Sequence, residues 1–93
     1  MTSASDISTI LAQRGVQYGK FTEHAKITQS LKSIMVNTPK WILLDDDQKE
    51  ALEMIAHKVG RILNGNKSYA DSWVDIAGYS KLVADRLETG VTV

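Results

Sequence analysis

A four-residue, turn-rich segment, NGNK at 64–67, separates two long stretches of helical periodicity, and it constrains the fold more than any other feature of the sequence. In both stretches apolar residues recur at intervals of three and four, which is typical of a helix with one buried face. These residues are Leu52, Ile55, Val59, Ile62 and Leu63 before the turn, and Trp73, Ile76, Ala77, Val83 and Leu87 after it. Helices joined by such a short connection pack antiparallel. The sequence therefore predicts a helical hairpin over about 46–64 and 68–88.

Capping residues in the first half of the chain predict two further helices. Asp6 is expected to cap a first, short helix at 7–14, because its carboxylate can accept hydrogen bonds from the free backbone N–H groups of the first turn. Gly15 is expected to end that helix. Thr22 is expected to cap a second helix that continues to about Met35.

These elements together predict an all-α fold. A short N-terminal helix precedes three main helices, and the last two form the antiparallel hairpin. We expect a single helical domain over 1–93, with flexible ends at 1–5 and 89–93. A chain of this length buries only a modest fraction of its surface, so we also expect a homo-oligomer.

Three consecutive aspartates, 45–47, precede the third helix. Carboxylates stabilise a helix N-terminus, and Asp47 with Glu50 three residues later fits a capping box. Helix capping therefore explains these aspartates better than a metal site does.

The segment VNTPKWILL at 36–44 interrupts the helical pattern, because Pro39 disfavours helix in the residue before it. Its second half, 41–44, is too apolar for a free loop. Two interpretations stay open: these residues fold back as a plug of the core, or they cover a neighbouring subunit.

The composition limits the classes of function. Eleven Lys and Arg balance eleven Asp and Glu, so the formal net charge is zero and gives no general attraction to nucleic acid or to an anionic membrane. The chain has no Cys, which excludes disulfides, thiolate catalysis and Cys-based metal sites. No apolar run approaches the roughly 18 residues of a membrane span, and the N-terminus does not resemble a signal peptide. We expect a soluble cytoplasmic protein.

The hairpin places four charged residues close together. For a bend near 66–67, facing residues have numbers that sum to roughly 132–134, so Lys58 lies level with Asp75 and Arg61 with Asp71. Two interpretations compete. The residues form two interhelical ion pairs that fix the register, or the aspartates hold a divalent cation while Lys58 and Arg61 receive a phosphate.

Two glycines bracket the tyrosine in GVQYGKF at 15–21. In one interpretation this is a tight connection in which Tyr18 and Phe21 plug the core. In the other, the backbone at Gly19 approaches a ligand and Tyr18 forms a wall of its site. His57, on the polar side of the third helix, is expected to be exposed to solvent.

Three segments of the chain, RGVQYGKF, ALEMIAHKVGRILNG and YADSWVDIAGYSKLVADRL, resemble a family of small uncharacterised all-α proteins of tailed phages and prophages. The resemblance extends from about Leu11 to Leu87. It rests on the Tyr-Gly pair, the K-x-x-R motif and the D-x-W-x-D-x-A-G-Y motif. It implies a bacterial host cell as the place where the protein acts.

More remotely, the same motifs are similar to the all-α nucleotide pyrophosphohydrolases of the MazG kind. Those proteins are helical and oligomeric, and they hydrolyse nucleoside triphosphates with Mg²⁺ held by E-x-x-E on one helix and E-x-x-D on the next. Glu50 and Glu53 match the first motif, but Asp71 and Asp75 differ from the second in spacing and in being two aspartates. Glu50 and Glu53 are also expected on the polar side of their helix, away from the hairpin seam.

The resemblance and the spacing together define a candidate site. Its expected ligand-binding residues are Tyr18, Gly19, Lys58, Arg61 and Tyr79, and its expected metal ligands are Asp71 and Asp75, with Glu50 and Glu53 as weaker candidates.

Three functions stay open. The first is nucleotide binding, with or without Mg²⁺-dependent hydrolysis of nucleoside triphosphates. The second is a non-catalytic phage protein that inhibits a host factor, such as a defence system. The third, association with nucleic acid through the lysines of the second helix, is the least expected.

Overall fold

Four α-helices and one short 3-10 helix follow one another in this computed structural model, which describes residues 4–91, with side chains from Asp6 onward. The elements are α1 (Ala4–Tyr18), α2 (Phe21–Val36), η1 (Trp41–Leu43), α3 (Asp46–Asn64) and α4 (Ala70–Thr89). The predicted all-α fold is confirmed, and so is the packing of the last two helices against each other.

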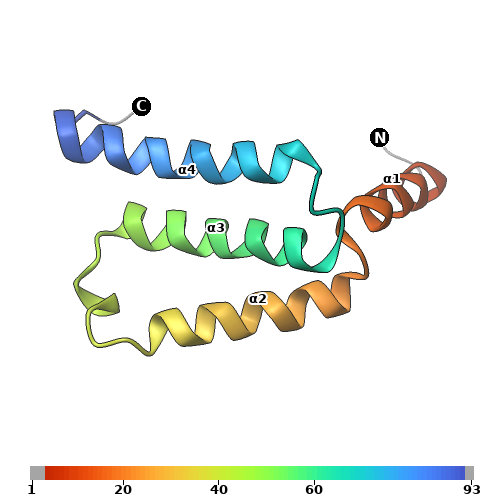
Figure 1. Cartoon of the computed structure of the whole chain (residues 1–93), viewed down its shortest axis with the longest axis horizontal. Coiled ribbons are helices and arrows are strands. Elements are labelled where there is room, and N and C mark those ends of the chain that lie inside the picture. The colour runs from red at the N-terminus through yellow and green to blue at the C-terminus, as the bar shows by residue number, and fades with distance from the viewer. Residues whose placement is uncertain (1–3, 92–93) are drawn as a thin grey trace.

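Helices α2, α3 and α4 lie side by side in one layer, and α1 projects from one end of it (Figure 1). The middle helix, α3, packs against α2 on one side and against α4 on the other. Because α2 and α4 flank α3 instead of closing into a bundle, little apolar surface is enclosed. Among the described side chains, Ala51 and Ala56 of α3 are the only buried hydrophobic ones.

The turn between α1 and α2 is fixed by a residue from the end of α3. Nδ2 of Asn64 donates hydrogen bonds to the backbone oxygens of Tyr18, at 2.9 Å, and Lys20, at 3.0 Å. Gly19 lies between them with a φ of 77°, and a Cβ at this position would be 2.3 Å from the carbonyl oxygen of Asn64. Only glycine combines this conformation with so close an approach. The contact sets the direction in which α1 leaves the layer.

The first helix is longer than predicted. It spans Ala4–Tyr18 instead of 7–14, and Gly15 lies inside it. Glycine lowers helix stability without ending a helix by itself. The backbone N–H of Gly19 still donates to the oxygen of Gly15, at 2.9 Å, so the helical hydrogen bonding continues to the point where Gly19 turns the chain.

Three predicted caps are wrong. Asp6 lies inside the first turn of α1, which begins at Ala4, and is not its N-cap. Thr22 lies inside the first turn of α2 and is not its N-cap. The capping box of α3 joins Asp45 and Gln48, not Asp47 and Glu50, and the backbone N–H of Asp45 donates to the Gln48 side chain at 2.8 Å. An N-cap residue has an extended backbone just before the helix begins. Asp45 has this conformation, with φ −71° and ψ 159°.

Ion pairs at two levels hold the hairpin of α3 and α4 in register. Nζ of Lys58 is 3.0 Å from Oδ2 of Asp75, as the hairpin arithmetic predicted. At the other end, Nη2 of Arg86 lies 2.9 Å from an Asp45 oxygen and 2.7 Å from an Asp47 oxygen. Asp45, the N-cap of α3, and Asp47, in its first turn, thus also bind the last turns of α4.

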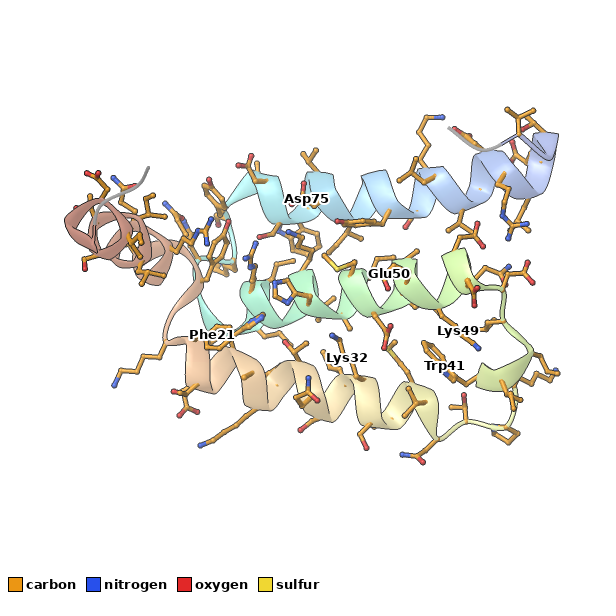
Figure 2. All side chains as sticks on the ribbon, turned by 180° about the vertical axis from the view of Figure 1, so that it is seen from behind. Phe21, Lys32, Trp41, Lys49, Glu50 and Asp75 are labelled. Atoms are coloured by element: carbon orange, nitrogen blue, oxygen red, sulfur yellow. The ribbon has the colours of Figure 1, made fainter. Side chains whose placement is uncertain are left out.

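The residues of the apolar segment at 41–44 differ in their environment, and only some of them pack on this chain. The Trp41 side chain is half-buried and points toward α3 (Figure 2). Ile42 and Leu43 are exposed. Trp41 therefore belongs to the packing of this chain, and coverage of a neighbouring subunit stays a prediction for the two exposed residues.

Of the ends predicted to be flexible, residues 1–3 and 92–93 lie outside the described residues. Ala4 begins α1 and Thr89 ends α4. Within the described residues, no helix has both the length and the apolar character needed to cross a bilayer.

Candidate functional site

A cavity of about 570 Å³ lies where the end of α1 and the start of α2 meet α3. We call it the elbow cavity. Cationic and aromatic side chains make up most of its wall, together with two glycines and one leucine. The lining residues are Leu11, Arg14, Gly15, Tyr18, Gly19, Lys20, Phe21, His24, His57 and Arg61.

All three charged side chains in this lining are cations. Arg14 comes from α1, Lys20 from the turn and Arg61 from α3, so three separate segments converge on the cavity. No carboxylate belongs to the lining. A concave site with charges of one sign attracts ligands of the opposite sign. The elbow cavity is therefore suited to an anion.

Arg61 lies against the face of Tyr18. Its Cζ is 4.1 Å from the ring centroid, within the range of a cation–π contact. The Tyr18 ring in turn meets the Tyr69 ring edge to face, with the ring centroids 5.9 Å apart and the planes at 78°. These two contacts fix the Tyr18 ring at the wall, and the guanidinium keeps donors for a ligand.

Phe21 stands at the start of α2, beside the junction with α1 (Figure 2). It is 76% exposed, so the prediction that it plugs the core is wrong. Its ring lies 6.2 Å from that of His24, with the planes at 34°. An exposed aromatic ring beside cations offers a stacking surface to a planar ligand group.

The two histidines of the chain meet below the cavity. Nε2 of His24 is 3.3 Å from Nδ1 of His57, and the rings are edge to face with centroids 4.6 Å apart. The hydroxyl of Thr28 also lies 3.3 Å from Nε2 of His24. His57 was predicted to be exposed, and this is wrong, because α2 covers the polar side of α3.

Burial keeps both imidazoles neutral. Burial, followed by the nearby charge of Arg61, lowers the pKa of His57 to about 4. Burial also lowers the pKa of His24, although the carbonyl of Gly60 opposes this effect. At neutral pH the pair adds no charge to the cavity, and it can supply both an N–H donor and a nitrogen acceptor.

Gly60 allows this histidine packing. A Cβ at Gly60 would lie 2.5 Å from Oγ1 of Thr28 and 3.1 Å from the ring of His24. The hairpin arithmetic, in which facing residues have numbers that sum to roughly 132–134, would pair Gly60 with Trp73 and Gly78 with Ile55. Gly60 faces α2 instead, and nothing lies within 4 Å of a Cβ at Gly78.

The predicted site residues do not form one cluster. Tyr18, Gly19 and Arg61 line the elbow cavity, whereas Lys58 and Asp75 pair with each other in the hairpin. Among the described ion pairs, none joins Arg61 to Asp71. Arg61 is turned toward α1 and Tyr18, which a two-helix register argument does not include.

Asp71 lies beside Tyr69. A hydrogen bond to its carboxylate, followed by the charge of that carboxylate, raises the pKa of Tyr69. Asp71 therefore has a local partner, Tyr69, at the start of α4.

The other three candidates lie in two separate hollows. Tyr79 and Glu50 line a hollow of about 240 Å³ between α3 and α4. Glu53 lines a different one, between α3 and α2, with Lys32. In Figure 2 the Glu50 side chain lies on the α4 side of α3, and Lys32 points from α2 toward α3. Among the described residues, no three His, Asp or Glu side chains are placed to share a metal ion.

Sequence reasoning missed Arg14, His24 and His57 as parts of one site. The histidines are 33 positions apart, and nothing local in the sequence shows that they touch. The sequence did contain one signal of this site, a cluster of basic and aromatic residues around the Tyr-Gly pair. Within 14–24 this cluster consists of Arg14, Tyr18, Lys20, Phe21 and His24.

Comparison with known proteins gives one match. A family model described as Domain of unknown function (DUF6378) matches residues 1–87, which include every residue of the elbow cavity. No curated protein and no solved structure matches the chain.

Proposed function

We propose that this chain, which belongs to the family described as Domain of unknown function (DUF6378), binds a nucleotide in the elbow cavity. The phosphates contact Arg14, Lys20 and Arg61, and the base lies against the rings of Tyr18 and Phe21. The protein acts as a nucleotide binder in the bacterial cytoplasm.

The observation that carries this proposal is the convergence of three cations around exposed aromatic surface with no carboxylate among them. Phosphates need several positive charges, and a base needs a flat apolar surface. A volume of about 570 Å³ is within the range of small-molecule sites, roughly 300–1,000 Å³. The cavity thus offers both kinds of contact that a nucleotide needs, cations for the phosphates and the planar rings of Tyr18 and Phe21 for the base.

Binding is better supported than hydrolysis. Hydrolysis of the MazG kind requires four carboxylates around Mg²⁺. Here Glu50 and Glu53 line different hollows, and Asp75 is neutralised by Lys58. We therefore propose that any Mg²⁺ arrives bound to the phosphates of the ligand, and that the chain does not hold a catalytic metal of its own.

Chemical denaturation in the presence of separate parts of a nucleotide tests the proposal. A triphosphate nucleotide at about 100 times its Kd should raise the free energy of unfolding by about 2.7 kcal/mol. The nucleoside alone and inorganic triphosphate alone should each stabilise the protein less. Including and omitting Mg²⁺ measures how much the ion contributes.

Arg61→Gln should remove about half of this stabilisation or more, which corresponds to an affinity lower by at least about tenfold. Lys81→Gln is the matched control, because Lys81 pairs with Asp85 on the surface of α4, away from the cavity. Equal stabilisation of wild type and Arg61→Gln, or no stabilisation of the wild type by any of these ligands, would refute the proposal.

A second candidate function is that of a phage protein which inhibits a host defence factor. The exposure of Ile42 and Leu43 at the tip formed by η1 supports it, because neighbouring exposed apolar residues mark contact sites for other proteins. In this case Ile42→Ser combined with Leu43→Ser should abolish protection of a phage in a defended host strain. Nucleotide-induced stabilisation should remain as in the wild type, which separates the two functions.

A further inference from the structure

The layer of α2, α3 and α4 has two chemically different faces. The elbow cavity and the two smaller hollows open on one of them, where α3 presents Glu50, Glu53, His57 and Arg61. We call this side the pocket face. The opposite side of the layer, which we call the apolar face, has none of these residues.

Helical geometry identifies the residues of the apolar face on α3. Lys58 points toward α4 and Gly60 toward α2, so two sides of α3 are occupied by its neighbours. At about 100° per residue, Leu52, Val59 and Leu63 lie roughly midway between those two sides and opposite Arg61. Leu63 is 65% exposed and Leu52 is also exposed.

The flanking helices continue this face. On α4, four residues line the hollow of the pocket face: Tyr79, Leu82, Val83 and Arg86. A stripe at intervals of three and four runs along another side of α4. On α2, Lys32 and Val36 line the pocket face, and Ile27 and Ile34 turn the other way. The residues of the apolar face on the flanking helices are Ile27 and Ile34 of α2, and Trp73, Ile76, Ala77, Ser80, Ala84 and Leu87 of α4.

Charged side chains avoid this side of α3 and α4. On α3 the charged residues, from Asp46 to Arg61, all fall on the sides of the pocket face or of the neighbouring helices. On α4 the apolar stripe from Trp73 to Leu87 likewise includes no charged residue. An exposed, continuous and uncharged apolar surface of this kind marks an interface.

The chain exposes more surface than a compact monomer of its mass, by an area large enough for an interface. The chain exposes 6763 Å², whereas a folded monomer of 10.3 kDa is expected to expose about 5,400 Å². The excess is about 1,400 Å² per chain, above the roughly 800 Å² that each subunit contributes to a standard interface. The radius of gyration, 15.6 Å, also exceeds the roughly 12 Å of a compact domain of this length.

We propose that the apolar face binds the same face of a second copy of this chain, forming a symmetric dimer of two stacked helical layers. On α3 and α4 this face carries no charge, and the chain has zero net charge, so two copies can meet at a self-complementary contact without net repulsion. The small side chains Ala77, Ser80 and Ala84 allow a helix of the second copy to approach closely. This inference does not depend on nucleotide binding, because the elbow cavity lies on the other face and stays open in the dimer.

Sedimentation velocity with the full chain, from low to high micromolar concentrations, tests this dimer. The wild type should sediment with twice the 10.3 kDa mass of one chain. Leu63→Glu should weaken the dimer at least about a hundredfold, tenfold for each copy of the substitution. Leu82→Glu is the matched control, because Leu82 is 51% exposed but lies on the pocket face. The control should remain dimeric.

Ile34→Glu, at an exposed position on α2, provides a second variant in case Leu63→Glu fails to fold, which far-UV circular dichroism would show. A wild type that is monomeric at high micromolar concentration would overturn the proposal. If such a monomer bound lipid vesicles, the apolar face would contact a membrane and not a second copy of the chain. A dimer that Leu63→Glu and Ile34→Glu leave intact while Leu82→Glu dissociates it would overturn the assignment of the face.

Discussion

The guanidinium of Arg61 lies on the ring of Tyr18, 4.1 Å from its centroid, and this contact joins α3 to the end of α1. It places a fixed positive charge and a fixed aromatic face at the same wall of the elbow cavity. The contact between Arg61 and Tyr18 forms only if α1 leaves the layer in the direction that Gly19 and Asn64 set.

Removing the Tyr18 ring should weaken nucleotide binding more than removing its hydroxyl. A base stacked on an aromatic ring contributes about 1–3 kcal/mol, and Tyr18 also holds Arg61 in place. We expect Tyr18→Ala to lose about that amount of binding free energy in a calorimetric titration and Tyr18→Phe to lose little. Equal losses in the two variants would show that the hydroxyl, and not the ring, contacts the ligand.

The neutral histidine pair should make stability depend on pH. The pKa of His57 is about 4 in the folded protein and 6.5 without burial, so between these values the unfolded state binds more protons. Stability is therefore complete above about pH 6.5 and decreases as pH falls toward about 4.

Urea denaturation across this pH window measures the effect. His57→Gln should make the decrease smaller without removing it, because burial also lowers the pKa of His24. An unchanged pH profile in His57→Gln would contradict the assigned burial of the imidazole.

Two glycines of the hairpin should respond oppositely to the same substitution. At Gly60 a Cβ would lie 2.5 Å from Oγ1 of Thr28, so Gly60→Ala should destabilise the fold by about 1–3 kcal/mol. Gly78 has open space, and Gly78→Ala should stabilise the protein by about 0.5–1 kcal/mol through helix propensity. Chemical denaturation of the two variants measures both changes, and stabilisation by Gly60→Ala would mean that α2 does not pack there.

Loss of the Asp75 charge should destabilise the protein. Lys58 is 9% exposed and pairs with Asp75 at 3.0 Å, so Asp75→Asn leaves a buried ammonium without its counter-ion. We expect a loss of about 1–2 kcal/mol in chemical denaturation, below the value for a fully buried pair, because the Asp75 side chain is 45% exposed.

Asp85→Asn is the control for this substitution, since its partner Lys81 is exposed, and it should change stability by less than about 0.5 kcal/mol. If Asp75→Asn instead stabilised the protein and abolished an effect of Mg²⁺, Asp75 would be a metal ligand and the ion-pair interpretation would be wrong.

The hairpin could be predicted because its determinants are local. Periodicity, a short turn and a rise of about 1.5 Å per residue were enough to pair Lys58 with Asp75. The same reasoning failed for His57, because amphipathicity assumes one buried side, whereas α3 has a helix on each of two sides.

The elbow cavity could not be predicted from local pattern. Its shape depends on the direction of α1, which a contact between Asn64 and the Tyr18–Lys20 turn fixes across more than 40 positions of sequence. The sequence indicated Tyr18 and Gly19 as functional candidates, but it placed Arg61 against Asp71 because it considered only the hairpin.

Isothermal titration calorimetry of a triphosphate nucleotide into the wild type and into Arg61→Gln is the direct test of nucleotide binding in the elbow cavity. We expect saturable binding of one nucleotide per chain to the wild type. The affinity of Arg61→Gln should be lower by at least about tenfold, which is the loss of one charge-assisted contact. Absence of saturable binding to the wild type, or the same affinity in both proteins, would contradict a nucleotide site in the elbow cavity.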